Sequence, residues 1–285
     1  MPDLAVIPLE HLDALSIRGP DARAFLQGQL SQDLERVTPS TPRLAGLHDP
    51  QGRCLALLRL FALDADQWLA VMPRELLAPV SERLLKYVLR SKVQLAPATS
   101  QWRAYGVWGP DAAAAAATRA HQMLDATEER ALVIAPRLEP LPDGEPLDEQ
   151  QWHAQDIRAG LPQVFAATSG LFTAQMLNLD LVDGVSFTKG CYTGQEIIAR
   201  THYLGQARRR MHRFHTLSGN LLAPAATVAL ADGRRARIVN AAPVEGGGQE
   251  FLAVTQAPGA VGATKSADTP ETLPAEELAL PYATT

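Results

Sequence analysis

Cysteine is scarce in this sequence of 285 residues, which contains only Cys54 and Cys191. Two cysteines this far apart make neither a disulfide framework nor a metal-ligand spacing, and their scarcity favours a reducing compartment. The seven histidines are scattered without ligand spacing. We therefore expect neither a structural disulfide nor a metal site.

Long apolar runs are also missing. No stretch approaches the ~18 apolar residues that cross a membrane. The first ten residues contain neither the basic nor the apolar region of a secretion signal. We therefore expect a cytoplasmic protein with no membrane partner.

An excess of positive charge is absent as well, since the net charge is −5. The whole molecule is therefore not biased toward nucleic acid. One concentrated basic stretch, at residues 200–213, contains Arg208–Arg210 and Arg213. An RNA-binding patch is one interpretation, but consecutive side chains on a strand alternate between faces and cannot all meet one partner. Direct RNA binding is accordingly not expected.

What remains is the composition of a globular protein, with 46% hydrophobic and 20% charged residues. A strand, a Gly-Pro-Asp corner and a helix are predicted twice. The first set has Leu12–Arg18 before Gly19, and the second has residues 105–108 before Gly109. Chance recurrence of a tripeptide is the alternative, but the shared context favours a duplicated α+β module.

Further elements follow from turn and cap signals. Pro73 is predicted to open a helix that Pro79 interrupts. Asp148 is predicted to begin a helix that stops at Gly160. Alternating residues around the Asp232-Gly233 turn predict a hairpin in an antiparallel C-terminal domain. We therefore expect three domains, covering residues 1–100, 101–205 and 206–285.

The stretch KGCYTGQE, residues 189–196, is the most specific motif of the sequence, and we call it the central motif. Thr193 is predicted to cap the N-terminus of a helix. Cys191 would then lie just before that helix and two residues from Lys189, and both features favour a reactive thiolate. The alternative is a buried cysteine that behaves as a small hydrophobe.

KGCYTGQE, followed by IIAR, resembles the signature of the YgfZ family, folate-binding relatives of the glycine-cleavage aminomethyltransferase. The resemblance extends to Gln151-Trp152, to residues 158–162 and to residues 25–30. It implies an α+β, aminomethyltransferase-like fold. In that fold, two related α+β domains and a C-terminal antiparallel β-barrel surround a central opening.

The resemblance also implies a bound tetrahydrofolate or another reduced folate. Trp152 would line the folate pocket, although a lone tryptophan is more often a packing residue. The guanidinium groups of Arg158 and Arg200 can bind the carboxylates of a folate tail or can form intramolecular ion pairs. The remaining implied contacts with folate come from Tyr192, Gln195 and Glu196, and Glu196 also suits the first turn of a helix. Cys191, with Lys189 beside it, is the candidate reactive group.

Two functions are open at this point. The first is a folate-binding factor that supports iron–sulfur protein assembly or repair and, through client enzymes such as a tRNA-thiolating enzyme, tRNA modification. The second is a folate-dependent one-carbon (aminomethyl) transferase. The transferase branch carries an acid pair where this sequence has Ala56 and Leu57, which carry no proton and no charge. Asp49 or Asp64 would have to substitute for them.

Overall fold

The computed structural model describes residues 4–110, 112–117, 122–127, 129–205, 207–257 and 272–284. The chain forms two compact units, each assembled from segments that are distant in the sequence. The first unit contains residues 1–48, 56–149 and 183–193, and the second contains residues 49–55, 150–182 and 194–285. The central motif is therefore divided between Thr193 and Gly194. The three domain boundaries expected from the sequence stay a prediction.

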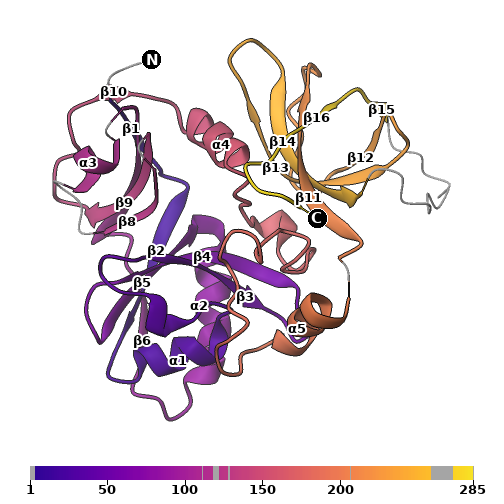
Figure 1. The fold of residues 1–285 in the computed structure, drawn as a ribbon. Coiled ribbons are helices and arrows are strands. Elements are labelled where there is room, and N and C mark those ends of the chain that lie inside the picture. The colour runs from indigo at the N-terminus through magenta and orange to yellow at the C-terminus, as the bar shows by residue number, and fades with distance from the viewer. Residues whose placement is uncertain are drawn as a thin grey trace. The chain divides into compact units, whose positions relative to one another are not determined.

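The first unit contains two five-stranded sheets (Figure 1). In one sheet the strand order is β3 (Arg43–His48), β4 (Cys54–Ala62), β5 (Gln67–Pro73), β2 (Leu12–Arg18) and β6 (Gln94–Pro97). Its helices are α1 (Ala22–Gln29) and α2 (Arg74–Val88), with a short 3-10 helix at Leu34–Arg36. Strands β4 and β5 are almost wholly buried. Their largely apolar sequences therefore form the core of this sheet.

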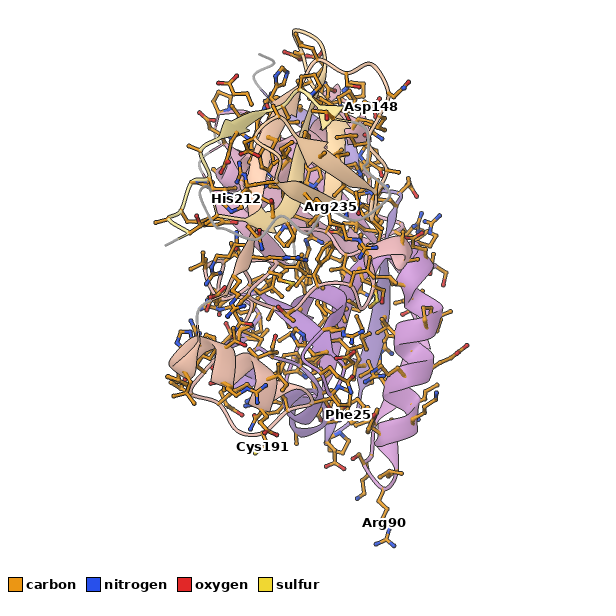
Figure 2. All side chains as sticks on the ribbon, turned by 90° about the vertical axis from the view of Figure 1, so that its right-hand side faces the viewer. Phe25, Arg90, Asp148, Cys191, His212 and Arg235 are labelled. Carbon is orange, nitrogen blue, oxygen red and sulfur yellow. The ribbon has the colours of Figure 1, made fainter. Side chains whose placement is uncertain are left out.

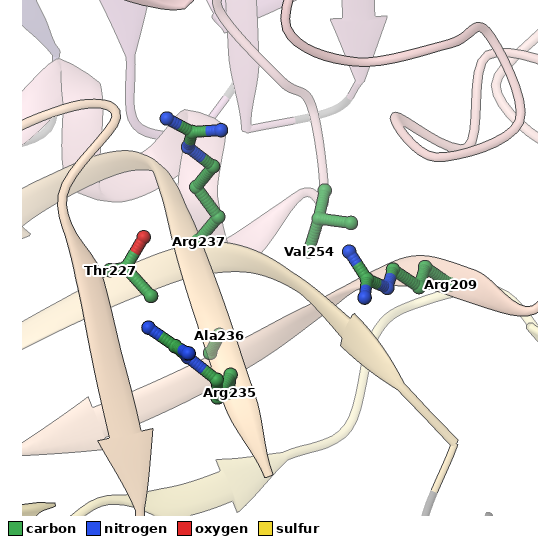
Figure 3. Close-up of a pocket in the computed structure, with 6 residues that line it drawn as sticks. All are labelled: Arg209, Thr227, Arg235, Ala236, Arg237 and Val254. Atoms are coloured by element: carbon green, nitrogen blue, oxygen red, sulfur yellow. The ribbon is translucent and has the colours of Figure 1, made fainter. Parts of the chain in front are cut away.

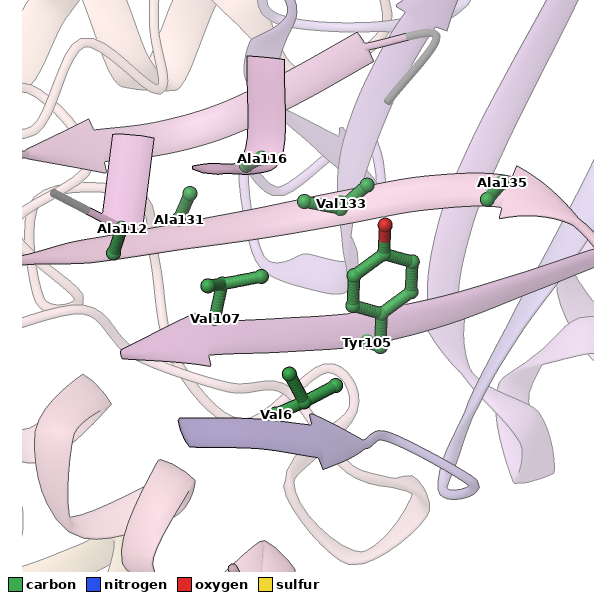
Figure 4. Packing of buried hydrophobic residues seen from close by; sticks show 8 residues of the cluster. All are labelled: Val6, Tyr105, Val107, Ala112, Ala116, Ala131, Val133 and Ala135. Atoms are coloured by element: carbon green, nitrogen blue, oxygen red, sulfur yellow. The ribbon is translucent and has the colours of Figure 1, made fainter. Parts of the chain in front are cut away.

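The other sheet of the first unit has the order β10 (Glu145–Pro146), β1 (Ala5–Pro8), β7 (Trp102–Trp108), β9 (Arg130–Pro136) and β8 (Gln122–Thr127). Helix α3 (Ala112–Ala117) packs against this sheet, and its Ala112 and Ala116 are fully buried. Figure 4 shows these two alanines in one cluster with Val107 of β7 and Val133 of β9. The small methyl side chains let the helix pack closely on the strands.

The two Gly-Pro-Asp corners have the same geometry. Gly19 and Gly109 both have a φ of +132°. The amide of Gly19 donates to Asp66 O, and that of Gly109 donates to Glu129 O, at 2.9 Å in both cases. The strands before the corners, β2 and β7, each pair antiparallel with two neighbours. Equal backbone conformation and pairing at both corners support the duplicated module.

The second unit contains helices α4 (Glu149–Arg158) and α5 (Gln195–Leu204), a 3-10 helix at Ala166–Thr168, and a six-stranded sheet. The strand order of that sheet is β15 (Thr272–Leu273), β12 (Thr227–Leu230), β13 (Arg235–Pro243), β14 (Gln249–Gln256), β11 (Arg209–Thr216) and β16 (Glu276–Leu278). The predicted hairpin is confirmed, with Gly233 at a φ of +82°. Neighbouring strands are antiparallel except β12 and β15, which are parallel.

Helix α1 ends at Gln29, because Leu30 is extended, and Leu34 lies in the 3-10 helix. One local prediction needs correction. Helix α2 continues through Pro79. Pro79 is exposed, so its ring lies on the solvent side of the helix.

None of the helices in the described segments combines the length and the apolar character that crossing a membrane requires.

Replacing Gly19 of the first corner and Gly28 of α1 by alanine should have opposite effects on stability. A Cβ atom at Gly19 would lie 2.0 Å from Lys92 O, whereas one at Gly28 in α1 would meet nothing within 4 Å. Gly19→Ala should lower the free energy of unfolding by about 2 kcal/mol or more, from the clash and the positive φ. Gly28→Ala should raise it by about 0.5–1 kcal/mol, because alanine favours helix. Urea unfolding measures both, and equal effects would contradict the corner geometry.

Candidate functional site

Lys189 joins the central motif to the end of helix α1. Its Nζ atom donates to three backbone carbonyl oxygens, each 2.7 Å away, those of Gln27, Leu30 and Gln32. The last carbonyls of a helix lack intrahelical partners and carry the negative end of its dipole. The last turn of α1 contains no basic residue of its own. Lys189 therefore supplies, from far along the chain, the cation that caps this helix.

The surroundings of Lys189 change its protonation. Burial lowers the pKa of Lys189 from 10.5 to about 8, and the nearby charge of Asp33 opposes part of that change. The ammonium also lies 5.1 Å from the centroid of the Tyr192 ring, in cation–π geometry. Burial raises the pKa of Tyr192 to about 12, so this phenol stays neutral at physiological pH. The tilted ring of His48 is 6.5 Å from that of Tyr192.

The segment before Lys189 is held by residues that the sequence analysis did not single out. Ser31 Oγ donates to Gly184 O at 2.6 Å, and the Ser186 amide donates to Ser31 O at 2.8 Å. Gln32 Nε2 donates to Asp183 O at 2.5 Å. Ser31 and Gln32 are fully buried. Buried polar groups require specific partners. The sequence shows two polar residues just after the segment that forms α1, but their burial is seen only in the fold.

Cys191 is exposed, whereas Cys54 is buried. Figure 2 labels Cys191 on the loop between Lys189 and α5. Gly190 beside it is also exposed, and a Cβ atom there would meet nothing within 4 Å. The structure thus excludes the alternative of a buried Cys191. Because the three N–H groups of Lys189 bind carbonyl oxygens, Lys189 acts as the anchor of this loop.

The prediction that Thr193 caps helix α5 is wrong. The N-cap is Gly194, with a φ of +85° and no side-chain capping bond. Glycine adopts this left-handed conformation without the steric cost that a β-branched threonine incurs. The helix therefore begins one residue later than expected.

Within the second unit, α5 is fixed by close packing. Gln175 Nε2 donates to Ile198 O at 2.7 Å. Gly52, at a φ of +74°, approaches so closely that a Cβ atom would lie 3.2 Å from Ile197. Two of the predicted folate contacts on this helix, Glu196 and Arg200, are exposed, while Gln195 is half-buried. Since Glu196 and Arg200 are four residues apart, they lie on one face of the helix.

Trp152 and Arg158 both lie on α4, and both side chains contact other parts of the protein. Trp152 is only 1% exposed, as the packing interpretation expects. Arg158 Nε donates to Glu250 Oε1 at 3.1 Å, and Arg213 Nη2 lies 2.8 Å from Glu250 Oε2. Arg158 therefore takes part in the intramolecular ion pair that the sequence left open. The arginine run is also divided, because Arg210 pairs with Asp180 at 2.9 Å.

The candidate acids of the transferase interpretation are not available on β4. Ala56 and Leu57 are fully buried apolar residues. Asp49 Oδ1 accepts from the Arg53 amide at 2.9 Å within its turn. Asp64 lies beyond the other end of β4, where its carboxylate accepts from the Asp66 amide and from Gln67 Nε2. Both aspartates therefore stabilise turns.

The structure thus places Lys189, Cys191 and Tyr192 together in the first unit. The other predicted site residues belong to the second unit: Trp152, Arg158, Gln195, Glu196 and Arg200.

The lowered pKa of Lys189 predicts a specific dependence of stability on pH. Between pH 8 and 10 the unfolded chain holds the Lys189 proton that the folded protein releases, so the free energy of unfolding rises with pH. Replacing Lys189 by methionine should remove that rise, and Lys86→Met, at an exposed position of α2, should keep it. Urea unfolding at several pH values measures the difference. Parallel pH profiles for wild type and Lys189→Met would contradict this assignment.

Comparisons with known proteins identify relatives of this chain. The family model of the GCVT N-terminal domain matches residues 3–131. The tRNA-modifying protein YgfZ of Serratia proteamaculans is 34% identical over 242 residues, which cover 76% of this chain and 73% of that protein. YgfZ of Escherichia coli O17:K52:H18 is 32% identical over 234 residues, covering 73% of this chain and 71% of that protein.

Among solved structures, the glycine cleavage system aminomethyltransferase T of Bartonella henselae is similar to this chain, with a TM-score of 0.65 at 15% identity. The similarity covers 89% of this chain and 78% of that one. It confirms the aminomethyltransferase-like fold that the sequence predicted. Taken with the sequence identity over about three quarters of the chain, these findings show that the chain belongs to the YgfZ family.

Proposed function

We propose that this protein is a reduced-folate-binding factor that supports iron–sulfur protein assembly or repair and, through a client enzyme, tRNA modification. The observation that carries the proposal is Cys191, an exposed thiol on a loop that Lys189 anchors through three hydrogen bonds. Relatives that share about a third of the sequence are named tRNA-modifying proteins. A fixed backbone with an accessible thiol suits thiol chemistry better than packing.

The folate part of the proposal is supported by the aminomethyltransferase-like fold and by exposed polar groups on α5. The Arg200 guanidinium matches the carboxylates of a folate tail, and the Glu196 carboxylate accepts the N–H groups of a pterin edge. Trp152 is buried, so contact with a pterin ring requires the side chains that cover it to move. The ligand of this proposal is tetrahydrofolate or another reduced folate.

The thiol part rests on the chemistry of exposed cysteine. Thiolates are the protein ligands of iron–sulfur clusters and the nucleophiles of sulfur exchange. An accessible Cys191 is therefore suited to meet a cluster or a sulfur atom carried by a client enzyme, such as one that thiolates tRNA. The cluster is then the cargo of the client, and the folate is the small molecule held by this chain.

The transferase alternative is disfavoured by the buried Ala56 and Leu57. We expect no detectable aminomethyl transfer to tetrahydrofolate in the presence of the glycine-cleavage partners, because no carboxylate stands where the family's acid pair assists the reacting nitrogen. An assay with a glycine-cleavage aminomethyltransferase as the positive control measures this. Turnover by the wild-type protein at a comparable rate would replace the proposed function by the alternative.

If folate binds beside Trp152, substitutions of two buried tryptophans should differ in their effect on folate affinity. Trp152→Phe should weaken tetrahydrofolate binding by about tenfold or more, the size typical of an aromatic hot spot. Trp68→Phe, at a fully buried residue of β5, should leave the affinity unchanged. Isothermal titration calorimetry with several reduced folates measures both. No binding by the wild type would refute the folate proposal, and equal affinities in the two variants would remove Trp152 from the site.

Cys191 makes a separate prediction. Because its side chain is exposed, Cys191→Ser should fold and bind folate like the wild type. Cells that carry only this variant should show low iron–sulfur enzyme activity and under-thiolated tRNA. Cys54→Ala serves as the control, since Cys54 is buried and should not be needed for this activity. Full complementation by Cys191→Ser would show that the thiol has no functional role.

A further inference from the structure

Three arginines of the second unit line one pocket on its six-stranded sheet. Figure 3 shows Arg209 of β11 with Arg235 and Arg237 of β13 around this pocket, together with Thr227, Ala236 and Val254. The pocket has a volume of about 270 Å³. All three arginines are exposed.

The register of the strands explains why these side chains meet. Arg235 and Arg237 are two residues apart, so they project from the same face of β13 at a spacing of ~7 Å. Thr227 of β12 and Val254 of β14 lie opposite Arg237 on either side. The adjacent residue, Ala236, belongs mainly to the other face, where it packs in the core with Ile238 and Phe251. The pocket therefore lies on the face of the sheet opposite to this core.

These arginines differ from four other arginines of the same unit. Arg158, Arg210, Arg213 and Arg234 each pair with a carboxylate. Among the described residues, no carboxylate pairs with the pocket arginines. Within those residues, the one hydrogen bond of their guanidinium groups runs from Arg237 Nε to Ala225 O. Three like charges that share a pocket raise the local potential and attract an anion.

We propose that Arg209, Arg235 and Arg237, with the Thr227 hydroxyl, form a binding site for a phosphate group. Guanidinium forks match the oxygens of phosphate with two parallel hydrogen bonds, and the hydroxyl adds a further donor. The volume lies just below the ~300 Å³ at which pockets for drug-sized ligands begin. The site therefore suits a phosphate group and is too small for a whole folate.

The phosphate can come from an RNA backbone or from a small phosphorylated molecule. The arginine run of β11 contributes only Arg209 to this pocket, because Arg210 and Arg213 are held by Asp180 and Glu250. An RNA strand would thus be bound by residues from β11 and β13 together, and not by the consecutive arginines that the sequence displays. The proposal does not depend on folate binding.

The test uses the full chain and two variants of equal charge. Arg235→Gln/Arg237→Gln removes two pocket arginines, and Lys86→Gln/Arg90→Gln removes two exposed cations of α2 and its end. The probes are inorganic phosphate and pyrophosphate, followed by the Nε–H signals of arginine in NMR, and a labelled single-stranded RNA, followed by fluorescence anisotropy. A tetrahydrofolate titration of the pocket variant checks that the proposed folate site is unaffected.

Perturbed arginine signals in the wild type, absent in the pocket variant and kept in the control, support the site. If RNA is the source, the pocket variant should bind RNA about tenfold more weakly or worse. Its salt dependence should also fall by about 1.4 in log–log slope, because two phosphate contacts are lost. Binding of phosphate or pyrophosphate without RNA binding assigns the site to a small molecule. Failure of every probe to bind, or equal losses in both variants, would overturn the proposal.

Discussion

The three hydrogen bonds from the Lys189 ammonium to the carbonyls of Gln27, Leu30 and Gln32 determine how the central motif is held. Gln27 and Leu30 lie at the end of α1, and Gln32 lies just beyond it. The three carbonyls at this place therefore match the three N–H groups of the lysine in number and in charge. The contact joins residues about 160 positions apart in the sequence. Since Cys191 follows two residues later, the backbone that carries the thiol is fixed while the thiol itself stays exposed.

Burial destabilises the charged form of Lys189, although the charge is needed for the contact. The lowered pKa of Lys189 shows that loss of water destabilises the ammonium more than the charge of Asp33 stabilises it. The Tyr192 ring and the buried Ser31 and Gln32 complete the surroundings of the anchor. Because its pKa is about 8, the Lys189 side chain loses its charge near pH 8. We therefore regard Lys189 as a structural element that supports the loop. Cys191 then remains the group of the motif best placed for chemistry.

Much of the fold was predictable because local signals and tertiary context agree. Gly19 and Gly109 mark two equivalent corners, and the Asp232-Gly233 turn connects the expected hairpin. Other features depend on contacts that the sequence does not reveal. The role of Lys189 required the distant end of α1, and the cap at Gly194 required a left-handed turn that the neighbouring threonine concealed.

The candidate site residues also differ in whether the sequence or the fold reveals their role. The motif identified Cys191, but pairing decided which arginines remain available for a ligand. Arg158 is bound to Glu250, whereas Arg200 is exposed on α5 and Arg235 and Arg237 face a pocket. Sequence patterns display the charges of a chain, and only the fold shows which of them are already compensated.

Hydrogen exchange of the motif loop in Lys189→Met measures whether the lysine holds this loop. Because the contact fixes the loop against the end of α1, the amides of residues 184–193 and 27–32 should exchange faster in the variant than in the wild type. The amides of β13 and β14, in the other unit, should exchange as before. Unchanged exchange across residues 184–193 would contradict the account.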